Sequence, residues 1–148
     1  MQPRYLRDLS IQYRPHPERL MLSPLSMKTP RDAAAVLDRL IGHQHQEVFG
    51  ALLLNTKGQI LCYREVCRGS LAAVEVHPRD VLIPALLVNA ASIIAAHNHP
   101  SGDPEPSPDD IALTARLLAA CLVIEVDLYD HIIIGDGGYF SFRESGRI

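Results

Sequence analysis

The sequence is short of cysteine and of long hydrophobic runs, and both shortages limit the class of protein. Its three cysteines, Cys62, Cys67 and Cys121, are odd in number, fit no Cys-x-x-Cys pattern and lie in apolar surroundings, which indicates packed thiols. No run reaches the ~18 uninterrupted apolar residues of a membrane span, and the first residues lack the apolar core of a signal peptide. We therefore expect a cytoplasmic protein with no membrane partner.

Positive charge is also scarce. Fourteen Lys and Arg residues face 17 Asp and Glu residues, which gives a net charge of −3 and no general attraction to nucleic acid. Basic residues outnumber acidic ones only at the front, where residues 1–28 hold Arg4, Arg7, Arg14, Arg19 and Lys28 against Asp8 and Glu18. A DNA partner would therefore depend on this basic arm.

The length of 148 residues predicts one domain after that arm. Residues 1–28 contain four prolines and no sustained hydrophobic period, so we expect an extended, partly ordered arm. The domain is predicted to occupy residues 29–148. Its composition, with 47% hydrophobic and 21% charged residues, is that of an ordinary globular protein.

Local signals predict helices and strands in mixed order. Three helices are expected where a cap or loop residue precedes a proline, at residues 30–42, 77–89 and 108–118. Strands are expected as a hairpin over residues 48–54 and 59–66, near 71–76, as a buried central strand over 91–96, within 122–134, and over 139–142. This order favours an α/β or α+β fold, a single mixed β-sheet with helices packed on it. The exposed strand edges of such a sheet are compatible with a homodimer.

The run His97-Asn98-His99 carries the strongest chemical signal. It comes where the apolar central strand ends, and residues two apart in a strand point to the same side. The two imidazoles therefore form half of a site for a divalent ion such as zinc, which needs a third ligand and leaves a fourth position to water.

Asp110 is the natural third ligand. The proline-rich segment 100–106 returns the chain to a helix that is expected to begin after Ser107, which places Asp110 in the first helical turn. Ser107 and Asp110 have a plainer interpretation as an N-cap and its capping partner. The His-x-His pair, the rigid return and the carboxylate at its far side together favour the metal site.

These residues resemble the motif of the JAB/MPN (JAMM) superfamily, which is an upstream Glu, then His-x-His, seven residues, Ser, two residues and Asp. The sequence His-Asn-His-Pro-Ser-Gly at residues 97–102 is most similar to that of the RadC-like branch, and the similarity extends over about residues 46–146. The resemblance implies a cytidine-deaminase-like JAB/MPN architecture. It also implies a zinc metalloprotease that cleaves peptide or isopeptide bonds in a protein or peptide substrate.

The resemblance also assigns roles to residues. It makes His97, His99 and Asp110 the ligands of one Zn²⁺ ion, and Glu47 the general acid/base that acts on the metal-bound water. Ser107 would help to hold the developing oxyanion. Two departures from the family are visible: the short basic arm stands where full-length RadC-like proteins commonly have a helix-hairpin-helix region, and Asn98 stands where the isopeptidases usually have Ser or Thr.

Two other functions stay open at this point. The traditional label of the family suggests an accessory module in DNA repair or anti-restriction that retains the metal site, and a metal could also serve folding alone. Elsewhere, Asp130 and His131 are interpreted as a structural pair. His43 and His45 are interpreted as solvated residues of a helix-to-strand connection.

Overall fold

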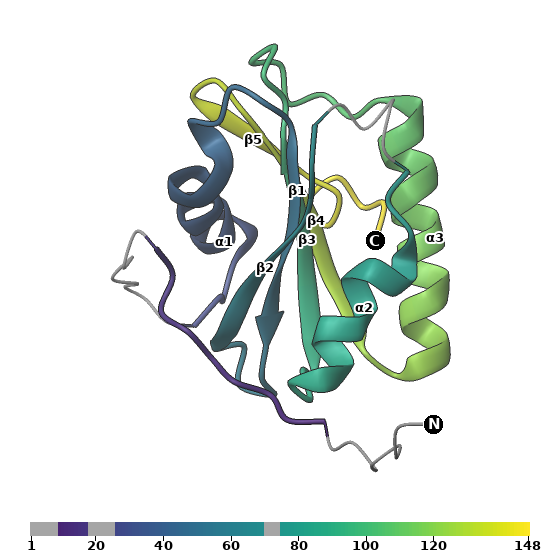
Figure 1. Cartoon of the computed structure of the whole chain (residues 1–148). Helices are drawn as coiled ribbons and strands as arrows, with labels where there is room; N and C mark the ends of the chain where they lie inside the picture. The colour runs from purple at the N-terminus through teal and green to yellow at the C-terminus, as the bar shows by residue number, and fades with distance from the viewer. Residues whose placement is uncertain (1–8, 18–25, 70–74) are drawn as a thin grey trace, which may run out of the picture.

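The computed structural model describes residues 9–17, 26–69 and 75–148 (Figure 1). In chain order, its elements are α1 (Pro30–Leu37), the π-helical turn η1 (Asp38–Gly42), β1 (Val48–Leu54), β2 (Ile60–Arg68), α2 (Pro78–Leu87), β3 (Ser92–Asn98), α3 (Pro108–Ile124), β4 (Asp127–Gly135) and β5 (Gly138–Ser141).

The five strands form one mixed sheet in the order β2-β1-β3-β4-β5. Strands β3 and β4 are parallel and the other neighbouring pairs are antiparallel. The predicted fold class, a single mixed sheet with helices packed on it, is confirmed. Because β3 and β4 are parallel, their carboxyl ends meet at the same edge of the sheet, and α3 makes the crossover between them.

Helices cover both faces of the sheet (Figure 1). On one face, α1 and η1 pack on alternate residues of the central strands, including Leu52, Ile94 and Ile132. On the other face, α2 and α3 pack on the intervening residues, including Ala51 and Ile93. Strands β1 and β3 are therefore buried on both sides, which explains their almost uninterrupted apolar sequences.

Capping boxes fix the starts of α1 and α3. The Thr29 hydroxyl accepts from the Asp32 amide while the Asp32 carboxylate accepts from the Thr29 amide, and Ser107 and Asp110 repeat this exchange. Each box satisfies amides at the helix N-terminus that have no acceptor within the helix. A proline follows each cap at the first helical position, where its missing N–H costs nothing.

The structure differs from the predicted elements mainly in the bounds of the strands. Residues 122–124, predicted as the start of a strand, are the last residues of α3, and β4 begins only at Asp127. Strand β3 continues through His97 to Asn98, and β2 reaches Arg68. The strand expected near 71–76 falls mostly outside the described residues, and Glu75 and Val76 are not in a strand.

Part of the expected arm contacts the domain. Ser26 forms an isolated β-bridge with Gln59, and Met27 is buried in the cluster beneath α1. Residues 9–16 have no helix or strand, and residues 13–17 line a cavity of about 630 Å³ with α1, β1 and β2. Residues 1–8 and 18–25 of the arm lie outside the described part of the chain.

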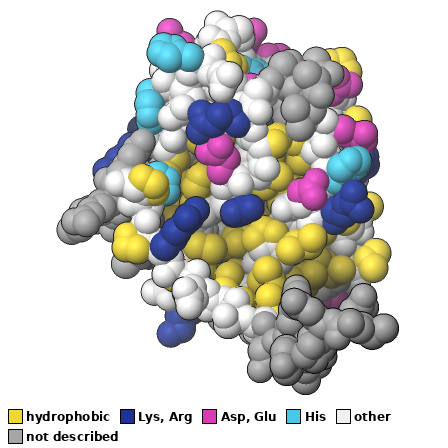
Figure 2. Space-filling model, in the orientation of Figure 1, with side chains coloured by type: hydrophobic (Ala, Val, Ile, Leu, Met, Phe, Trp, Pro, Cys, Tyr) yellow, Lys and Arg dark blue, Asp and Glu magenta, His cyan; other side chains and the backbone are white. Residues whose placement is uncertain are grey.

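The surface carries apolar side chains over α2. Ile83, Leu86 and Leu87 are all exposed, and Figure 2 shows hydrophobic side chains gathered on the lower half of the visible face, where α2 and the hairpin of β1 and β2 lie. None of the described helices is long and apolar enough to cross a membrane. The three cysteines are free, and Cys121 is buried as expected for a packed thiol.

Candidate metal centre

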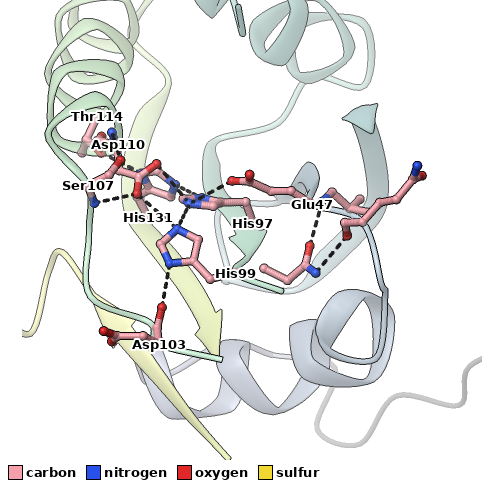
Figure 3. Close-up of polar contacts among 11 residues, drawn as sticks. Glu47, His97, His99, Asp103, Ser107, Asp110, Thr114 and His131 are labelled. Carbon is pink, nitrogen blue, oxygen red and sulfur yellow. Dashed lines mark hydrogen bonds and ion pairs between the residues drawn. The ribbon is translucent and has the colours of Figure 1, made fainter. Parts of the chain in front are cut away.

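Four segments meet where β3 ends. His97 is the penultimate residue of β3, His99 follows the strand, Asp110 lies in the first turn of α3, and Glu47 immediately precedes β1 (Figure 3). Because β1 runs antiparallel to β3 and pairs Phe49 with His97, the start of β1 lies beside the end of β3. This register brings Glu47 to the histidines across fifty residues of sequence.

The two imidazoles face each other as the His-x-His spacing predicts. The Nε2 atoms of His97 and His99 are 3.0 Å apart, and the ring centroids are 4.9 Å apart. His97 is completely buried, whereas the side chain of His99 is 16% exposed. One nitrogen from each ring is thus directed at the same small volume, which is open to solvent on the side of His99.

The Asp110 carboxylate contacts both rings. Its Oδ1 lies 3.1 Å from His97 Nε2, and its Oδ2 lies 3.3 Å from His99 Nε2. Oδ2 also accepts the Ser107 amide at 2.8 Å, so the capping role and the contact with the histidines are both present in one side chain. Burial opposes ionisation of Asp110, but its contacts with His97 and His99 outweigh burial and hold the pKa of this carboxyl well below its usual range.

Glu47 approaches from the other side of His97. Its Oε1 lies 3.8 Å from His97 Nε2, and its side chain is 18% exposed. Glu47, His97 and His99 each offer one ligand atom, and these atoms all lie within 4.8 Å of one another. Imidazole nitrogens and carboxylate oxygens are the donors that hold zinc and related divalent ions in proteins. The cluster therefore fits a metal ion by the chemistry of its donors.

Hydrogen bonds fix both histidine rings from behind. His99 Nδ1 lies 2.7 Å from the Asp103 carbonyl oxygen, in the proline-rich segment. His97 Nδ1 lies 3.0 Å from Nε2 of His131, which is completely buried. Burial lowers the pKa of His131 well below the usual histidine value, whereas the contact with Asp110 raises the pKa of His99.

Asn98, between the two histidines, points to the opposite face of the sheet and holds the segment before β1. Its Oδ1 accepts the Val48 amide at 2.7 Å, and its side-chain amide donates to the carbonyl oxygens of Gln44 at 3.2 Å and Gln46 at 3.0 Å. Because Glu47 lies between these anchored residues, Asn98 fixes the backbone that carries Glu47. A serine or threonine hydroxyl, with a single hydrogen to donate, could not make all three bonds.

The structure brings together His97, His99, Asp110 and Glu47 and places Ser107 next to them as the N-cap of α3. The Ser107 hydroxyl accepts the Asp110 amide at 3.1 Å, and Ser107 is an exposed residue. His43 and His45 are exposed. Asp130 is structural: its carboxylate accepts from the His131 and Arg143 amides and from the Ser141 hydroxyl, and burial, its largest perturbation, raises the pKa of Asp130.

Sequence reasoning missed two residues of the centre. His131 was interpreted as part of a structural pair with Asp130, but its ring contacts His97, on the neighbouring parallel strand. Thr114 was not singled out, although it follows Asp110 by one helical turn and its hydroxyl contacts the His131 ring at 2.7 Å. Helical spacing could have indicated Thr114, whereas no local pattern links His97 to His131.

Comparison with known proteins identifies the family of this chain. A family model described as the RadC-like JAB domain matches residues 27–147. A UPF0758 protein of Shouchella clausii is 46% identical over 120 residues, which cover 81% of this chain and 52% of that protein. A UPF0758 protein of Methanosarcina acetivorans is 47% identical over 120 residues, with the same two shares, and one of Bacillus cereus is 45% identical over 123 residues, which cover 83% and 55%.

The chain spans about half the length of these relatives. The matched region includes every residue of the metal centre, from Glu47 to His131. The chain therefore belongs to the RadC-like JAB domain family.

Proposed function

We propose that the chain is a zinc-dependent hydrolase that cleaves amide bonds in a protein or peptide substrate. The observation that carries this proposal is the convergence of two imidazole Nε2 atoms, 3.0 Å apart, with carboxylates on two sides of them. Nitrogen and oxygen acceptors at such distances repel each other unless a proton or a cation lies among them. The partial exposure of His99 and Glu47 leaves an approach for a substrate.

Two carboxylates compete for the place of third ligand, and we assign it to Asp110. Asp110 is within 3.3 Å of both imidazoles, is almost completely buried and is held by the capping box. Glu47 is farther from His97, at 3.8 Å, and more exposed. The longer contact and the access to solvent favour Glu47 as the group that exchanges protons rather than as a ligand.

When bound, a zinc ion supplies Lewis acidity, which polarises a carbonyl group and lowers the pKa of water. The residues of the chain supply the rest. The Glu47 carboxylate accepts a proton from the attacking water and delivers it to the nitrogen of the leaving amine. The Ser107 hydroxyl accepts from the Asp110 amide and retains its own hydrogen, which it can donate to an oxygen that gains negative charge.

Two matched substitutions test the assignment of the carboxylates. Glu47→Gln should retain zinc and lose hydrolysis of an internally quenched peptide library, because only the proton acceptor is removed. Asp110→Asn keeps an acceptor for the Ser107 amide but lowers the charge of the ligand set, so zinc affinity should fall. His99→Ala should lose the ion.

Zinc content by elemental analysis and affinity by competition with a chromophoric chelator measure these outcomes. Loss of zinc from Glu47→Gln with retention by Asp110→Asn would reverse the roles of the two carboxylates. A Glu47→Gln protein that cleaves the library at the wild-type rate would refute the hydrolytic mechanism.

A further inference from the structure

A buried chain of hydrogen bonds continues behind His97, away from the candidate metal position. His97 Nδ1 lies 3.0 Å from His131 Nε2, and His131 Nδ1 lies 2.7 Å from the Thr114 hydroxyl oxygen. That hydroxyl donates to the Asp110 carbonyl oxygen at 2.6 Å. In Figure 3, His131 and Thr114 lie on the side of His97 that faces α3. The positions of the hydrogens in this chain decide which nitrogen of His97 carries a lone pair.

The Thr114 hydroxyl can donate to only one of its two partners. Its hydroxyl has one hydrogen, and the 2.6 Å contact with the Asp110 carbonyl oxygen uses it, since a carbonyl has none to offer. The Thr114 oxygen must therefore accept at its 2.7 Å contact with His131. It follows that His131 carries a hydrogen on Nδ1.

The tautomer of His131 then determines the tautomer of His97. His131 is completely buried between aromatic rings, with Phe142 stacked on it and Phe49 at its edge, so the uncharged form of the ring is favoured. An uncharged ring with a hydrogen on Nδ1 has a lone pair on Nε2. His131 Nε2 therefore accepts from His97 Nδ1, so that an uncharged His97 has its lone pair on Nε2, the atom directed at His99 and Asp110.

We propose that Thr114 and His131 are positioning residues that hold His97 in its Nδ1-protonated form, so that Nε2 is ready to bind a divalent cation. The proposal deepens the proposed function and rests on it for the identity of the ligand. Neither residue needs to touch the ion or a substrate. Hydrogen bonds to the outer nitrogen of a ligand histidine fix its tautomer and the orientation of its ring.

The two ligand histidines differ in how their tautomers are fixed. His99 uses Nδ1 toward a backbone carbonyl, that of Asp103, which no side-chain substitution removes. The tautomer of His97 depends on the side chains of His131 and Thr114, and this chain of hydrogen bonds ends at the Asp110 carbonyl oxygen. The Asp110 carboxylate itself contacts His97 Nε2. A change at Thr114 should therefore alter His97 while leaving in place every side chain that faces the candidate metal position.

Thr114→Val is the informative substitution, because valine keeps the branched shape but removes the hydroxyl. His131 Nδ1–H would then lack its acceptor, which favours movement of the hydrogen to His131 Nε2. His97 would in turn accept at Nδ1 and carry its hydrogen on Nε2, facing the metal position. Thr114→Ser, the matched control, retains the hydroxyl and should behave as the wild type.

Two measurements on the full chain test the proposal. Nitrogen-15 NMR of the metal-free protein at about pH 8, above the usual histidine range, should show His97 protonated at Nδ1 in the wild type and in Thr114→Ser, and at Nε2 in Thr114→Val. Zinc affinity, by chelator competition, should fall by about 10–100-fold in Thr114→Val and be unchanged in Thr114→Ser.

A wild-type spectrum with His97 protonated at Nε2 overturns the proposal, and this readout remains if Thr114→Val does not fold. A folded Thr114→Val protein that retains the Nδ1-protonated form of His97 overturns it as well, and so does one that binds zinc within about twofold of wild type. If no variant binds zinc but the spectra change as expected, the positioning chain stands and the proposed function fails.

Discussion

Replacement of Asn98 should displace Glu47 and leave the binding of metal almost unchanged. Its side chain makes three hydrogen bonds to the backbone of residues 44–48, and the bond to the Val48 amide is completely buried. Asn98→Ala removes all three and adds no new group. The segment before β1 would lose its connection to the end of β3.

The expected cost follows from the contacts. At about 1 kcal/mol for each hydrogen bond, the three bonds contribute roughly 3 kcal/mol, and the buried Val48 amide is left without an acceptor. For a chain of this size, 1 kcal/mol corresponds to about 2–4 °C in Tm, so Asn98→Ala should unfold roughly 6–12 °C below the wild type. Zinc affinity should change little, because Asn98 points away from the ligand atoms, whereas hydrolysis should fall with the displacement of Glu47.

Asn98→Asp gives a sharper version of the same test. One carboxylate oxygen can still accept from Val48, but the other faces the carbonyl oxygens of Gln44 and Gln46, which only a donor can satisfy. The protonated form supplies that donor, so the folded protein should raise the pKa of the new carboxyl. The stability of this variant should therefore be greatest below the ordinary aspartate pKa and be lost as pH rises through the folded pKa.

Thermal unfolding followed by circular dichroism at several pH values measures both effects. An Asn98→Ala protein with the wild-type Tm, or an Asn98→Asp protein whose Tm difference from wild type is independent of pH, would show that Asn98 does not anchor this segment.

Three further predictions concern the fold. Thr29→Ala should lower the free energy of unfolding, measured by urea denaturation, by about 1 kcal/mol because α1 loses its N-cap. Thr56→Ala, in an exposed turn, is the control, and equal effects of the two substitutions would contradict the capping role. The Thr29 hydrogen bonds lower the pKa of Asp32, so this carboxylate stabilises the fold at pH values above its ordinary pKa, and the stabilisation is lost as pH falls through the folded pKa. Asp32→Asn should therefore weaken the fall in the free energy of unfolding at acid pH, and an unchanged fall would refute this. The buried Tyr63 hydroxyl has no hydrogen-bond partner among the described residues, and a Cβ on Gly50 would clash with it. Gly50→Ala should therefore lower the free energy of unfolding by about 1–3 kcal/mol, whereas Tyr63→Phe should leave it equal or higher. A large loss of stability in Tyr63→Phe would reveal a partner for the hydroxyl.

Elements with local signals were predictable from the sequence. Both capping boxes are visible as a Ser or Thr, a proline and an acid within four residues, and α1 and α3 begin where these signals place them. The hairpin turn is equally local. Asn55 accepts the amides of Lys57 and Gln59, and Gly58 adopts a positive φ of 71°, which glycine tolerates best.

The end of α3 had no such signal. The helix ends at Ile124, and the C-cap residue Glu125 has a left-handed conformation with φ of 56° where glycine is usual, so no glycine marks the end. The apolar run 122–124 was interpreted as the start of a strand, but it lies in α3, where Leu122 is 73% and Val123 83% exposed. The apolar sequence suggested a strand there, whereas the helix continues through it and directs Leu122 and Val123 to solvent.

The candidate site was predictable only in part. His97, His99 and Asp110 lie on one strand-loop-helix unit, so their convergence follows from short-range geometry. Glu47 required the family resemblance, because only the pairing of β1 with β3 brings it near. His131 depends on the register of β4 against β3 across 34 residues, which no local pattern specifies.

Asp110 Oδ2 takes part in two structures at once, since it accepts the Ser107 amide and contacts His99. The first turn of α3, the longest of the described helices, is therefore joined to the cluster through the Asp110 carboxylate. Any cation that draws on this oxygen will alter how readily the start of the helix opens. Amide exchange at Ser107, which is not among the proposed ligands, will then respond to the ion and report its binding without a measurement of turnover.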